Sequence, residues 1–360
     1  MRPVSRIAIF GLGWAAERLH LPACRLLPGV EVVAACDPDG GRRASVGRRF
    51  GIRALYDDPQ TLLEKEGPDI VIVATPPDSH RDLALLALEC GSHVFCEKPF
   101  VRSVAEADEV IATAERRRRT VVVNNEYRFM LIYRVARERI AAGAFGQPFF
   151  IQCWQQMFYL PAGGPEWRAR LVESTLFEFG THVLDLMCYF FDALPLSITA
   201  HTPRPFPGTE ADVLVQATVR FPGDRLAALS LNRLSHALQR YLEMRVDCER
   251  ASLRISFGGV ARACLEWSGA LSRPIARFSL ARGGEARVES SGRSRLLAAE
   301  RREGRPAATA LNLQSLIEDV KDGVASLERA RYARELIRLV AAGYESARTG
   351  ETVWLQRPGR

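Results

Sequence analysis

The chain has 360 residues, which is enough for two domains that each bury a core of their own. Its hydrophobic content of 47% and charged content of 25% are ordinary for a globular protein, and no apolar run approaches a membrane helix of ~20 residues. The N-terminal apolar segment continues into a glycine turn without a separate cleavage region, so it does not resemble a signal peptide. We therefore expect a cytoplasmic protein with no membrane partner.

The formal net charge is +7, and the densest basic run is residues 116–119. This run closes a predicted helix, where cations suit the helix dipole, and no aromatic residues are interleaved with it. We therefore expect no nucleic-acid partner. The eight cysteines show no C-x-x-C spacing and several lie in apolar runs, which predicts reduced, buried thiols.

Apolar runs and amphipathic stretches alternate through the first third of the chain, which predicts βαβ units and a parallel sheet. The predicted strands are 6–11, 30–36, 54–56, 70–75, 93–96 and 120–124. The predicted helices are 14–27, 40–50, 58–66, 79–90 and 103–118, with a further helix at 129–142 that leads out of this domain.

The pattern changes after Gln147, where segments of period two follow one another and only one clear helix, about 176–191, interrupts them. These segments are 147–157, 195–201, 211–220, 226–232, 241–248 and 251–257. They predict a mostly antiparallel sheet that is open on one face. Further on, residues 277–280 and 286–289 could form a hairpin around Gly283 and Gly284, residues 297–306 could be a mobile loop, and helices near 311–325 and 329–349 close the chain.

A glycine-rich turn follows the first predicted strand directly, with the sequence Gly-Leu-Gly-Trp-Ala-Ala at residues 11–16. The order of strand, tight turn and helix start is the context of a dinucleotide-binding fingerprint. Two glycines let the backbone turn sharply and approach a pyrophosphate, which the helix N-terminus then holds. We therefore predict that Gly11, Gly13, Trp14 and Ala15 bind a dinucleotide cofactor.

Asp37 ends the second predicted strand, where an acidic residue can accept hydrogen bonds from the adenosine ribose. Its charge would repel a 2′-phosphate, so NAD(H) is favoured. Arg42 and Arg43 could instead meet that phosphate, which keeps NADP(H) possible, but we expect them to be solvated helix residues. A turn aspartate before Pro38 is the structural alternative for Asp37.

Lys98 ends the strand at 93–96, and the carboxyl ends of strands in a doubly wound sheet face the ligand. A lysine there can reach both a cofactor and a substrate hydroxyl. Its ammonium can orient an alcohol and favour alkoxide character as a hydride leaves.

These residues resemble the Gfo/Idh/MocA oxidoreductase family of glucose–fructose oxidoreductase, inositol dehydrogenase and the rhizopine-catabolism proteins. The motifs that carry the resemblance are residues 11–16, 36–39, 74–80, 97–99, 125–129, 167–168, 178–182 and 344–347. The resemblance implies an α/β protein with an N-terminal Rossmann doubly wound parallel sheet in an NAD(P)-binding domain, residues 1–125. It implies a C-terminal α+β domain, residues 126–360, with a large, mostly antiparallel open sheet for substrate binding and oligomerisation. The last helices could pack back on the Rossmann domain, and a homodimer or homotetramer is expected.

Several site residues follow from the resemblance. Lys98 matches the family lysine that contacts the substrate and the nicotinamide ribose. Further cofactor contacts are expected from Thr75, Pro76, His80 and Glu97. Substrate contacts are expected from Asn125, Tyr127, Arg128, Trp167 and Arg168, although Trp167 could equally be a core residue.

Glu178 and His182 are four residues apart, so on an α-helix both side chains share one face. The family usually has aspartate in place of Glu178, with the histidine as general acid/base. We therefore expect His182 to exchange the carbinol proton and Glu178 to orient its ring. Asp185 is expected to form hydrogen bonds in the core or to a residue that contacts the substrate, and no metal site is expected.

The resemblance predicts an NAD(P)-dependent oxidoreductase that acts on the carbinol or ketone of a sugar, inositol or related polyol. One alternative is a cofactor-retaining enzyme that works by transient oxidation, in epimerisation or glycoside cleavage. The other is a non-catalytic dinucleotide-sensing regulator, which the presence of both Lys98 and His182 disfavours.

Overall fold

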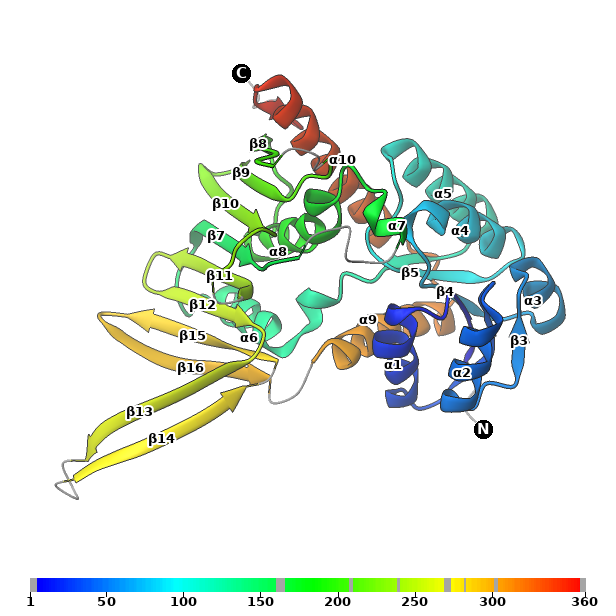
Figure 1. The fold of residues 1–360 in the computed structure, drawn as a ribbon, viewed down its shortest axis with the longest axis horizontal. Helices are drawn as coiled ribbons and strands as arrows, with labels where there is room; N and C mark the ends of the chain where they lie inside the picture. The colour runs from blue at the N-terminus through cyan, green and yellow to red at the C-terminus, as the bar shows by residue number, and fades with distance from the viewer. Residues whose placement is uncertain are drawn as a thin grey trace. The chain divides into compact units, whose positions relative to one another are not determined.

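The structure, a computed structural model, describes residues 5–159, 166–206, 210–237, 240–268, 273–281, 283–300 and 304–356. The chain forms two compact units (Figure 1). The first unit comprises Met1–Phe129, Phe177–Asp185 and Arg305–Ala342, and the second comprises Met130–Leu176, Leu186–Gly304 and Gly343–Arg360.

The first unit is built on a six-stranded sheet in the order β3-β2-β1-β4-β5-β6, and every neighbouring pair is parallel. Its strands are β1 (Ser5–Phe10), β2 (Val30–Cys36), β3 (Ala54–Tyr56), β4 (Ile70–Val73), β5 (His93–Cys96) and β6 (Val121–Val123). All four residues of β4 are buried, as expected for a central parallel strand covered on both faces. The predicted parallel, doubly wound sheet is confirmed.

Helices of the first unit connect these strands or, in the case of η3 and α9, follow the last of them. They are η1 (Ala16–His20), α1 (Leu21–Leu26), α2 (Gly40–Phe50), α3 (Pro59–Glu66), η2 (Pro77–Ser79), α4 (His80–Glu89), α5 (Val104–Arg117), η3 (Glu126–Phe129) and α9 (Arg305–Lys321). Asp39, Asp58 and Ser103 cap α2, α3 and α5, because each side chain accepts a hydrogen bond from a backbone N–H of the first turn.

Although α9 comes late in the chain, it belongs to the core of the first unit. It packs against α1, η1 and η3, and Figure 1 shows it beside α1. Its residues Leu313, Leu316 and Ile317 are buried in one cluster with β1 residues such as Ile7 and Ile9. The helix predicted at 311–325 therefore begins earlier and ends earlier than expected.

The second unit contains a nine-stranded sheet in the order β16-β15-β12-β11-β7-β10-β9-β8-β17. The strands are β7 (Pro148–Gln156), β8 (Ser197–His201), β9 (Leu214–Phe221), β10 (Arg225–Asn232), β11 (Arg240–Cys248), β12 (Ser252–Phe257), β15 (Gly284–Ser290), β16 (Arg293–Glu300) and β17 (Val353–Trp354). Only the pair β7–β10 is parallel among these neighbours. The predicted mostly antiparallel sheet is confirmed.

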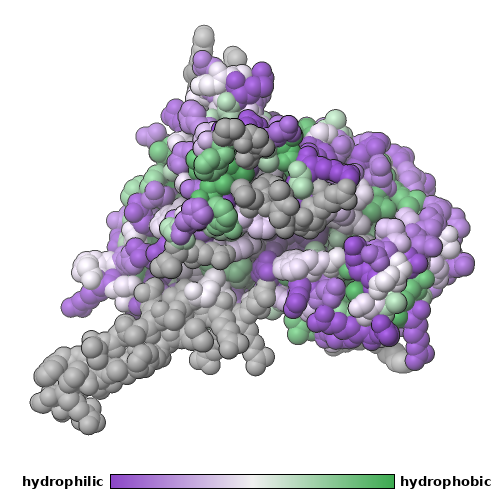
Figure 2. Space-filling view, viewed as in Figure 1, coloured by the Kyte–Doolittle hydropathy of each residue, from purple (hydrophilic) through white to green (hydrophobic). Residues whose placement is uncertain are grey.

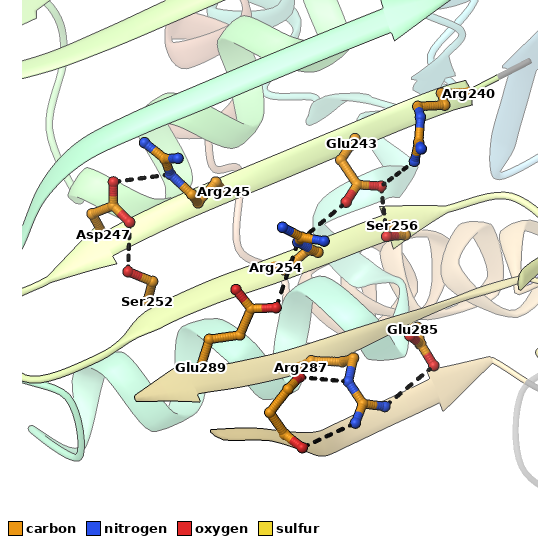
Figure 3. A network of polar contacts seen from close by, with 11 residues as sticks. Arg240, Glu243, Arg245, Asp247, Ser252, Arg254, Ser256, Glu285, Arg287 and Glu289 are labelled. Atoms are coloured by element: carbon orange, nitrogen blue, oxygen red, sulfur yellow. Dashed lines mark hydrogen bonds and ion pairs between the residues drawn. The ribbon is translucent and has the colours of Figure 1, made fainter. Parts of the chain in front are cut away.

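The two faces of this sheet differ in polarity, because side chains alternate along each strand. On β11, Leu242, Met244 and Val246 are buried, and α6 (Leu131–Ala141) packs against β12, β15 and β16. The opposite face carries a network of ion pairs and hydrogen bonds across β11, β12 and β15 (Figure 3). Arg254, for example, lies between Glu243 and Glu289, at 3.7 and 3.6 Å.

The hairpin predicted around Gly283 and Gly284 is wrong. Strand β14 (Arg273–Ala281) pairs with β13 (Val260–Ser268), whereas β15 pairs with β12 and β16. Gly284 begins β15, with φ +115°, and a Cβ there would lie 2.1 Å from the carbonyl oxygen of Ser256. This glycine thus serves a close approach of two strands, and not a turn. The loop predicted at 297–306 is also wrong in part, because residues 297–300 belong to β16.

Three helices have residues in both units: η5 (Leu176–Gly180), α8 (Thr181–Phe191) and α10 (Glu328–Thr349). No helix within the described ranges is both long and apolar enough to cross a membrane. On the face drawn in Figure 2, hydrophilic residues cover most of the coloured surface and apolar residues form small patches. Cys24, Cys36, Cys96, Cys153, Cys188 and Cys248 are buried free thiols as predicted, whereas the free thiol of Cys90 is exposed.

Candidate active site

The glycine turn lies against the end of β4. Gly11 has φ +86°, and a Cβ there would lie 2.8 Å from both the Ala74 oxygen and the Thr75 side chain, so only glycine fits. A Cβ at Gly13 would meet no atom within 4 Å. The protein's own packing therefore does not require glycine at position 13, and the open space suits a ligand that approaches the backbone closely. Trp14, the next residue, is 57% exposed.

Asp37 is buried at the end of β2, with 2% of its surface exposed. Its carboxylate accepts hydrogen bonds from the backbone N–H groups of Leu12 (2.7 Å) and Asp39 (2.9 Å), and Arg42 pairs with it at 3.3 Å. Arg43 donates to the carbonyl oxygens of Asp37 and Pro38. Arg42 is an exposed residue of α2, as expected, although it also pairs with Asp37, whereas Arg43 is less exposed than expected, with 22% of its side chain accessible.

His80 is fully buried in the first unit, and both ring nitrogens face backbone carbonyls. Its Nδ1 lies 3.0 Å from the Pro99 oxygen, and its Nε2 lies 2.9 Å from the Thr75 oxygen. Burial lowers the pKa of the ring. The ring thus joins the loops after β4 and β5, and it has no exposed surface to offer a cofactor. Beside it, the Ser79 hydroxyl donates to Thr75 Oγ1 at 2.7 Å.

Glu97 is also buried, beneath the loop that carries Lys98. His20 Nε2 lies 2.8 Å from its Oε1, and Asn124 Nδ2 donates to the same oxygen at 2.8 Å. Burial opposes the charged form, but His20, Asn124 and Lys98 together hold the pKa of this carboxyl below its usual range. Glu97 was predicted to contact the cofactor, and the structure instead places its carboxylate in a buried network.

Lys98 follows β5 and reaches across to η5, where its Nζ donates to the backbone oxygen of Glu178 at 3.3 Å. The Lys98–Pro99 peptide bond is cis. Arg102, a few residues on, places its guanidinium 4.5 Å from the ring centroid of Phe177 in the same η5 segment. The loop after β5 and the segment that leads into His182 are therefore tied together at two points.

His182 lies at the start of α8 and is almost fully buried. Its ring stacks on Tyr127, with the centroids 3.8 Å apart and the planes within 5° of parallel. Its Nδ1 is buried without a hydrogen-bond partner. Burial lowers the pKa of the imidazole well below its ordinary value, and the charges of Lys98 and Arg305 lower it further. The ring is therefore neutral near pH 7.

The contact that Glu178 makes with Lys98 differs from the role that the sequence predicted for its carboxylate, which stays a prediction. His182 Nδ1 has no partner, and the group of Glu178 that contacts Lys98 is its backbone carbonyl. The prediction assumed α-helical spacing, in which residues four apart share a face. The segment Leu176–Gly180 is instead a π-helix, whose wider turns shift that register.

Arg128 was predicted to contact substrate, and the structure gives its guanidinium other partners. Its Nε donates to Asp185 at 3.0 Å and its Nη2 to the Tyr332 hydroxyl at 2.7 Å. Tyr332 in turn donates to Asp185 at 2.9 Å. Asp185 is buried, as expected of a core hydrogen-bonding residue. This network fixes α8 three residues beyond His182, and the predicted substrate contact of Arg128 stays a prediction.

The remaining predicted substrate residues are divided between the units. Asn125 belongs to the first unit and is buried, with its Oδ1 lacking a hydrogen-bond partner. Trp167 and Arg168 belong to α7 (Glu166–Ala169) of the second unit, where the Arg168 guanidinium lies 4.7 Å from the Trp167 ring. They are not among the residues that the first unit brings together around Lys98.

Two charged residues were missed as site residues. Glu126 lies within the motif at residues 125–129. It is 2% exposed, and its buried Oε2 has no hydrogen-bond partner. Burial, followed by the charge of Glu97, raises its pKa to about 8. Arg305 begins α9, and its guanidinium lies 4.8 Å from the ring centroid of Trp14. Nothing in the sequence around Arg305 distinguishes it from the many other arginines of the chain.

No group of three potential ligands from His, Cys, Asp and Glu is close enough to hold a metal ion among the residues that the structure describes. The site that the first unit assembles thus consists of the glycine turn, Asp37, the cation Lys98 and the stacked pair Tyr127 and His182.

Comparison with known proteins places these residues in a family. Residues 5–125 match the oxidoreductase family with an NAD-binding Rossmann fold, GFO_IDH_MocA, and residues 133–254 match the GFO/IDH/MocA C-terminal domain. A D-apiose dehydrogenase from Paraburkholderia graminis is 33% identical over 51% of this chain and 49% of its own length. The scyllo-inositol 2-dehydrogenase (NAD(+)) of Bacillus subtilis is 31% identical over 54% of this chain and 56% of its own. The matched regions therefore span about half the length of these curated relatives.

Solved structures share the fold over almost the whole chain. An oxidoreductase from Agrobacterium radiobacter in complex with NAD+, L-tartaric acid and magnesium has a TM-score of 0.80, with 20% identity over 97% of this chain and 98% of its own. An aldose-aldose oxidoreductase from Caulobacter crescentus also has a TM-score of 0.80, with 20% identity over 98% of this chain and 100% of its own. At such identities the likeness shows the fold alone. From the two family matches, the chain belongs to the Gfo/Idh/MocA oxidoreductase family.

Proposed function

We propose that this protein is an NAD(P)-dependent oxidoreductase that transfers a hydride between a nicotinamide and the carbinol or ketone carbon of a sugar, inositol or related polyol. The observation that carries the proposal is the contact of Lys98 Nζ with the Glu178 carbonyl at 3.3 Å. It ties a cation at the end of β5 to the segment that leads into a neutral histidine. The sugar and inositol dehydrogenases among the relatives support the substrate class.

The first unit fits a dinucleotide, and a bound nicotinamide would supply the hydride acceptor or donor. The glycine turn offers close backbone approach, and Asp37 offers carboxylate oxygens at the end of β2. NAD(H) is favoured, because Asp37 would repel a 2′-phosphate and Arg42 is already paired with it. We assign cofactor binding to residues 1–125, and substrate binding and assembly to residues 126–360.

In oxidation, His182 acts as the general base that takes the hydroxyl proton. Its pKa is depressed, so the ring is unprotonated and ready to accept. The ammonium of Lys98 stabilises the alkoxide as the proton leaves, which compensates for the weak basicity of the ring. Tyr127 holds the imidazole plane by stacking. In the reverse direction the imidazolium returns the proton to the developing alkoxide.

We propose further that the protein is a cytoplasmic homo-oligomer, assembled through the polar face of the nine-stranded sheet. Free, buried thiols suit a reducing compartment. The polar face presents arginines and carboxylates in alternation (Figure 3), so that two copies related by a two-fold axis can pair opposite charges. The exposed arginines Arg245 and Arg254 are the clearest candidates for such pairing.

A screen of the purified protein against sugars and cyclitols, read at the absorbance band of the reduced nicotinamide, tests the proposal. We expect turnover with at least one polyol, dependent on added NAD+. Binding of NAD(H) with no turnover on any polyol or its ketone would contradict the proposed activity and favour a dinucleotide-sensing regulator.

A further inference from the structure

Glu126 is a buried acid on η3, the segment that follows the edge strand β6. Only 2% of its surface is exposed, and its Oε2 has no hydrogen-bond partner among the residues that the structure describes. Leaving a buried polar oxygen without a partner is costly for a folded protein. A ligand that supplies the missing hydrogen bond explains why a protein would keep such a group.

Two further buried polar atoms without partners lie close to Glu126 in the first unit. Within the described ranges, Asn125 Oδ1 and His182 Nδ1 also have no hydrogen-bond partner. Asn125 directly precedes Glu126, and the ring of His182 stacks on Tyr127, the residue that follows it. Buried polar atoms are normally paired. Three such atoms around the short segment 125–127 therefore indicate that this part of the protein binds a polar ligand.

The surroundings of Glu126 favour the neutral form of its carboxyl group. Burial is the main cause, and the charge of Glu97 adds to it, whereas the charges of Lys98 and Arg305 act in the opposite direction. The balance raises the pKa of Glu126 to about 8, so the group is mostly protonated at pH 7. A protonated carboxyl has one O–H donor and keeps acceptor oxygens. It can thus pair with a hydroxyl group, which is also both donor and acceptor.

The order of the strands places Glu126 beyond the part of the sheet that a dinucleotide would cover. Neighbouring strands follow one another as β2, β1, β4, β5 and β6, with Asp37 after β2, the glycine turn after β1, Lys98 after β5 and Glu126 after β6. A dinucleotide held by Asp37 and the glycine turn points its nicotinamide towards β4 and β5. Because neighbouring strands are ~4.8 Å apart, Glu126 lies one strand past Lys98, on the side of the substrate.

We propose that Glu126 binds a hydroxyl group of the polyol substrate other than the one that is oxidised, and so helps to determine which polyol the enzyme accepts. This inference rests on the proposed function, because it requires a polyol substrate. The reacting hydroxyl is already served by His182 and Lys98. A hydroxyl that does not react forms the same hydrogen bond in the bound substrate and in the transition state, so Glu126 should affect KM and leave kcat nearly unchanged.

Replacement of Glu126 by leucine and by glutamine tests the proposal on the best polyol substrate. Leucine has no polar side-chain atom, so Glu126→Leu should raise KM for the polyol about two- to tenfold, the range for an uncharged hydrogen bond. Glu126→Gln keeps a donor and an acceptor and should stay closer to the wild type. Affinity for NAD+ and kcat should change little in both. Glu115→Leu is the matched control, because Glu115 is an exposed glutamate of α5 that pairs with Arg331, and it should leave KM unchanged.

Deoxy analogues of the same polyol identify the hydroxyl that Glu126 binds. In the wild-type protein, removal of that hydroxyl should raise KM by about the factor that Glu126→Leu does. In Glu126→Leu the same analogue should have the KM of the parent polyol, because the protein partner is already gone. Such non-additivity is expected of two groups in direct contact, whereas independent effects would add.

Urea unfolding distinguishes a binding role of Glu126 from a structural one. Glu126→Leu replaces a buried carboxyl that has an unpaired oxygen with an apolar group. The variant should therefore be at least as stable as the wild type while it binds the polyol more weakly. A structural role predicts the opposite result, which is a loss of stability.

Four outcomes separate the two proposals. An unchanged KM in a folded, active Glu126→Leu variant would overturn the role of Glu126 and leave the proposed function intact. A Glu126→Leu variant that is destabilised and loses kcat together with affinity would also overturn that role alone. A wild-type protein that turns over no polyol would overturn both proposals. A raised KM in a stable Glu126→Leu variant, with one deoxy analogue that affects only the wild type, supports the inference.

Discussion

Tyr127 and His182 stack face to face, with their ring centroids 3.8 Å apart and their planes within 5° of parallel. The two residues come from η3 and α8, which are distant in the chain. Because His182 Nδ1 has no hydrogen-bond partner, no carboxylate fixes this ring through Nδ1, as a general base is commonly fixed. Stacking and burial therefore set the plane of the imidazole, and Tyr127 acts as its positioning residue.

Replacement of Tyr127 tests this relationship. Tyr127→Leu removes the stacking partner and should lower kcat about two- to tenfold, the range that an aromatic pair contributes. Tyr127→Phe keeps the ring and should retain turnover close to the wild type. Steady-state kinetics on both variants, with cofactor affinity measured separately, provide the comparison. Equal losses in the two variants would show that the hydroxyl, and not the stacked ring, matters.

Cofactor preference follows from the pair Asp37 and Arg42. Asp37→Ser should remove the repulsion of a 2′-phosphate and release Arg42 from its partner. We expect the ratio of NADPH to NADH affinity to rise by at least about tenfold, since the charge of a buried carboxylate repels a nearby phosphate. Fluorescence titration with both cofactors measures the ratio. Tighter binding of NADPH by the wild-type protein would contradict the assigned preference.

Glu126 predicts a pH dependence of stability. Its folded-state pKa of about 8 lies above the ordinary value of 4.5, so the folded protein holds this proton more tightly than the unfolded chain. The stabilisation is complete below the ordinary pKa and is lost as the pH rises to about 8, at no more than ~1.4 kcal/mol per pH unit. Glu126→Gln mimics the protonated acid and removes this dependence.

Urea unfolding at pH 5 and pH 9 measures the effect of Glu126. The variant Glu126→Gln should gain stability relative to the wild type between these two pH values. A constant difference between the two proteins across this range would show that the carboxyl does not titrate there.

Assembly through the sheet predicts a defined oligomer. Light scattering at micromolar concentration should give a multiple of the 40.0 kDa chain mass. Arg254→Glu reverses a charge on the polar face and should weaken association, whereas Arg81→Glu changes a surface arginine of the first unit and should not. A wild-type monomer at that concentration would exclude this interface.

Much of the fold and part of the site could be predicted from the sequence. The alternation of strands and helices predicted the parallel sheet, and Asp37 and Lys98 follow its strand ends as expected. These predictions were confirmed because each depends on local sequence and on the rule that parallel strands end at one edge. The motif around His182 indicated the histidine by resemblance, and its role stays a prediction.

Other features depend on contacts between distant segments, and no local pattern indicates them. Arg128 pairs with Asp185, 57 residues away, and no local pattern in the sequence indicates this pairing. The π-helix at Leu176–Gly180 changed the register between Glu178 and His182. Arg305 lies beside Trp14 because α9, late in the chain, packs against the helix that follows the glycine turn.

Steady-state kinetics on Lys98→Ala and Glu178→Gln separate the roles of these two residues from that of His182. Lys98→Ala should reduce turnover strongly and shift alcohol oxidation to higher pH, because the alkoxide loses its cationic partner. Glu178→Gln preserves the shape of the side chain and removes only its charge, so it should have a much smaller effect on turnover.

The most direct measurement is the turnover of His182→Ala on the best polyol substrate, with NAD+ affinity measured on the same preparation. We predict that kcat falls by about 10²–10⁴-fold, as expected when a positioned acid/base is removed, while NAD+ affinity stays close to the wild type. Turnover near the wild-type value in a folded, NAD+-binding His182→Ala variant would contradict the account and require another base.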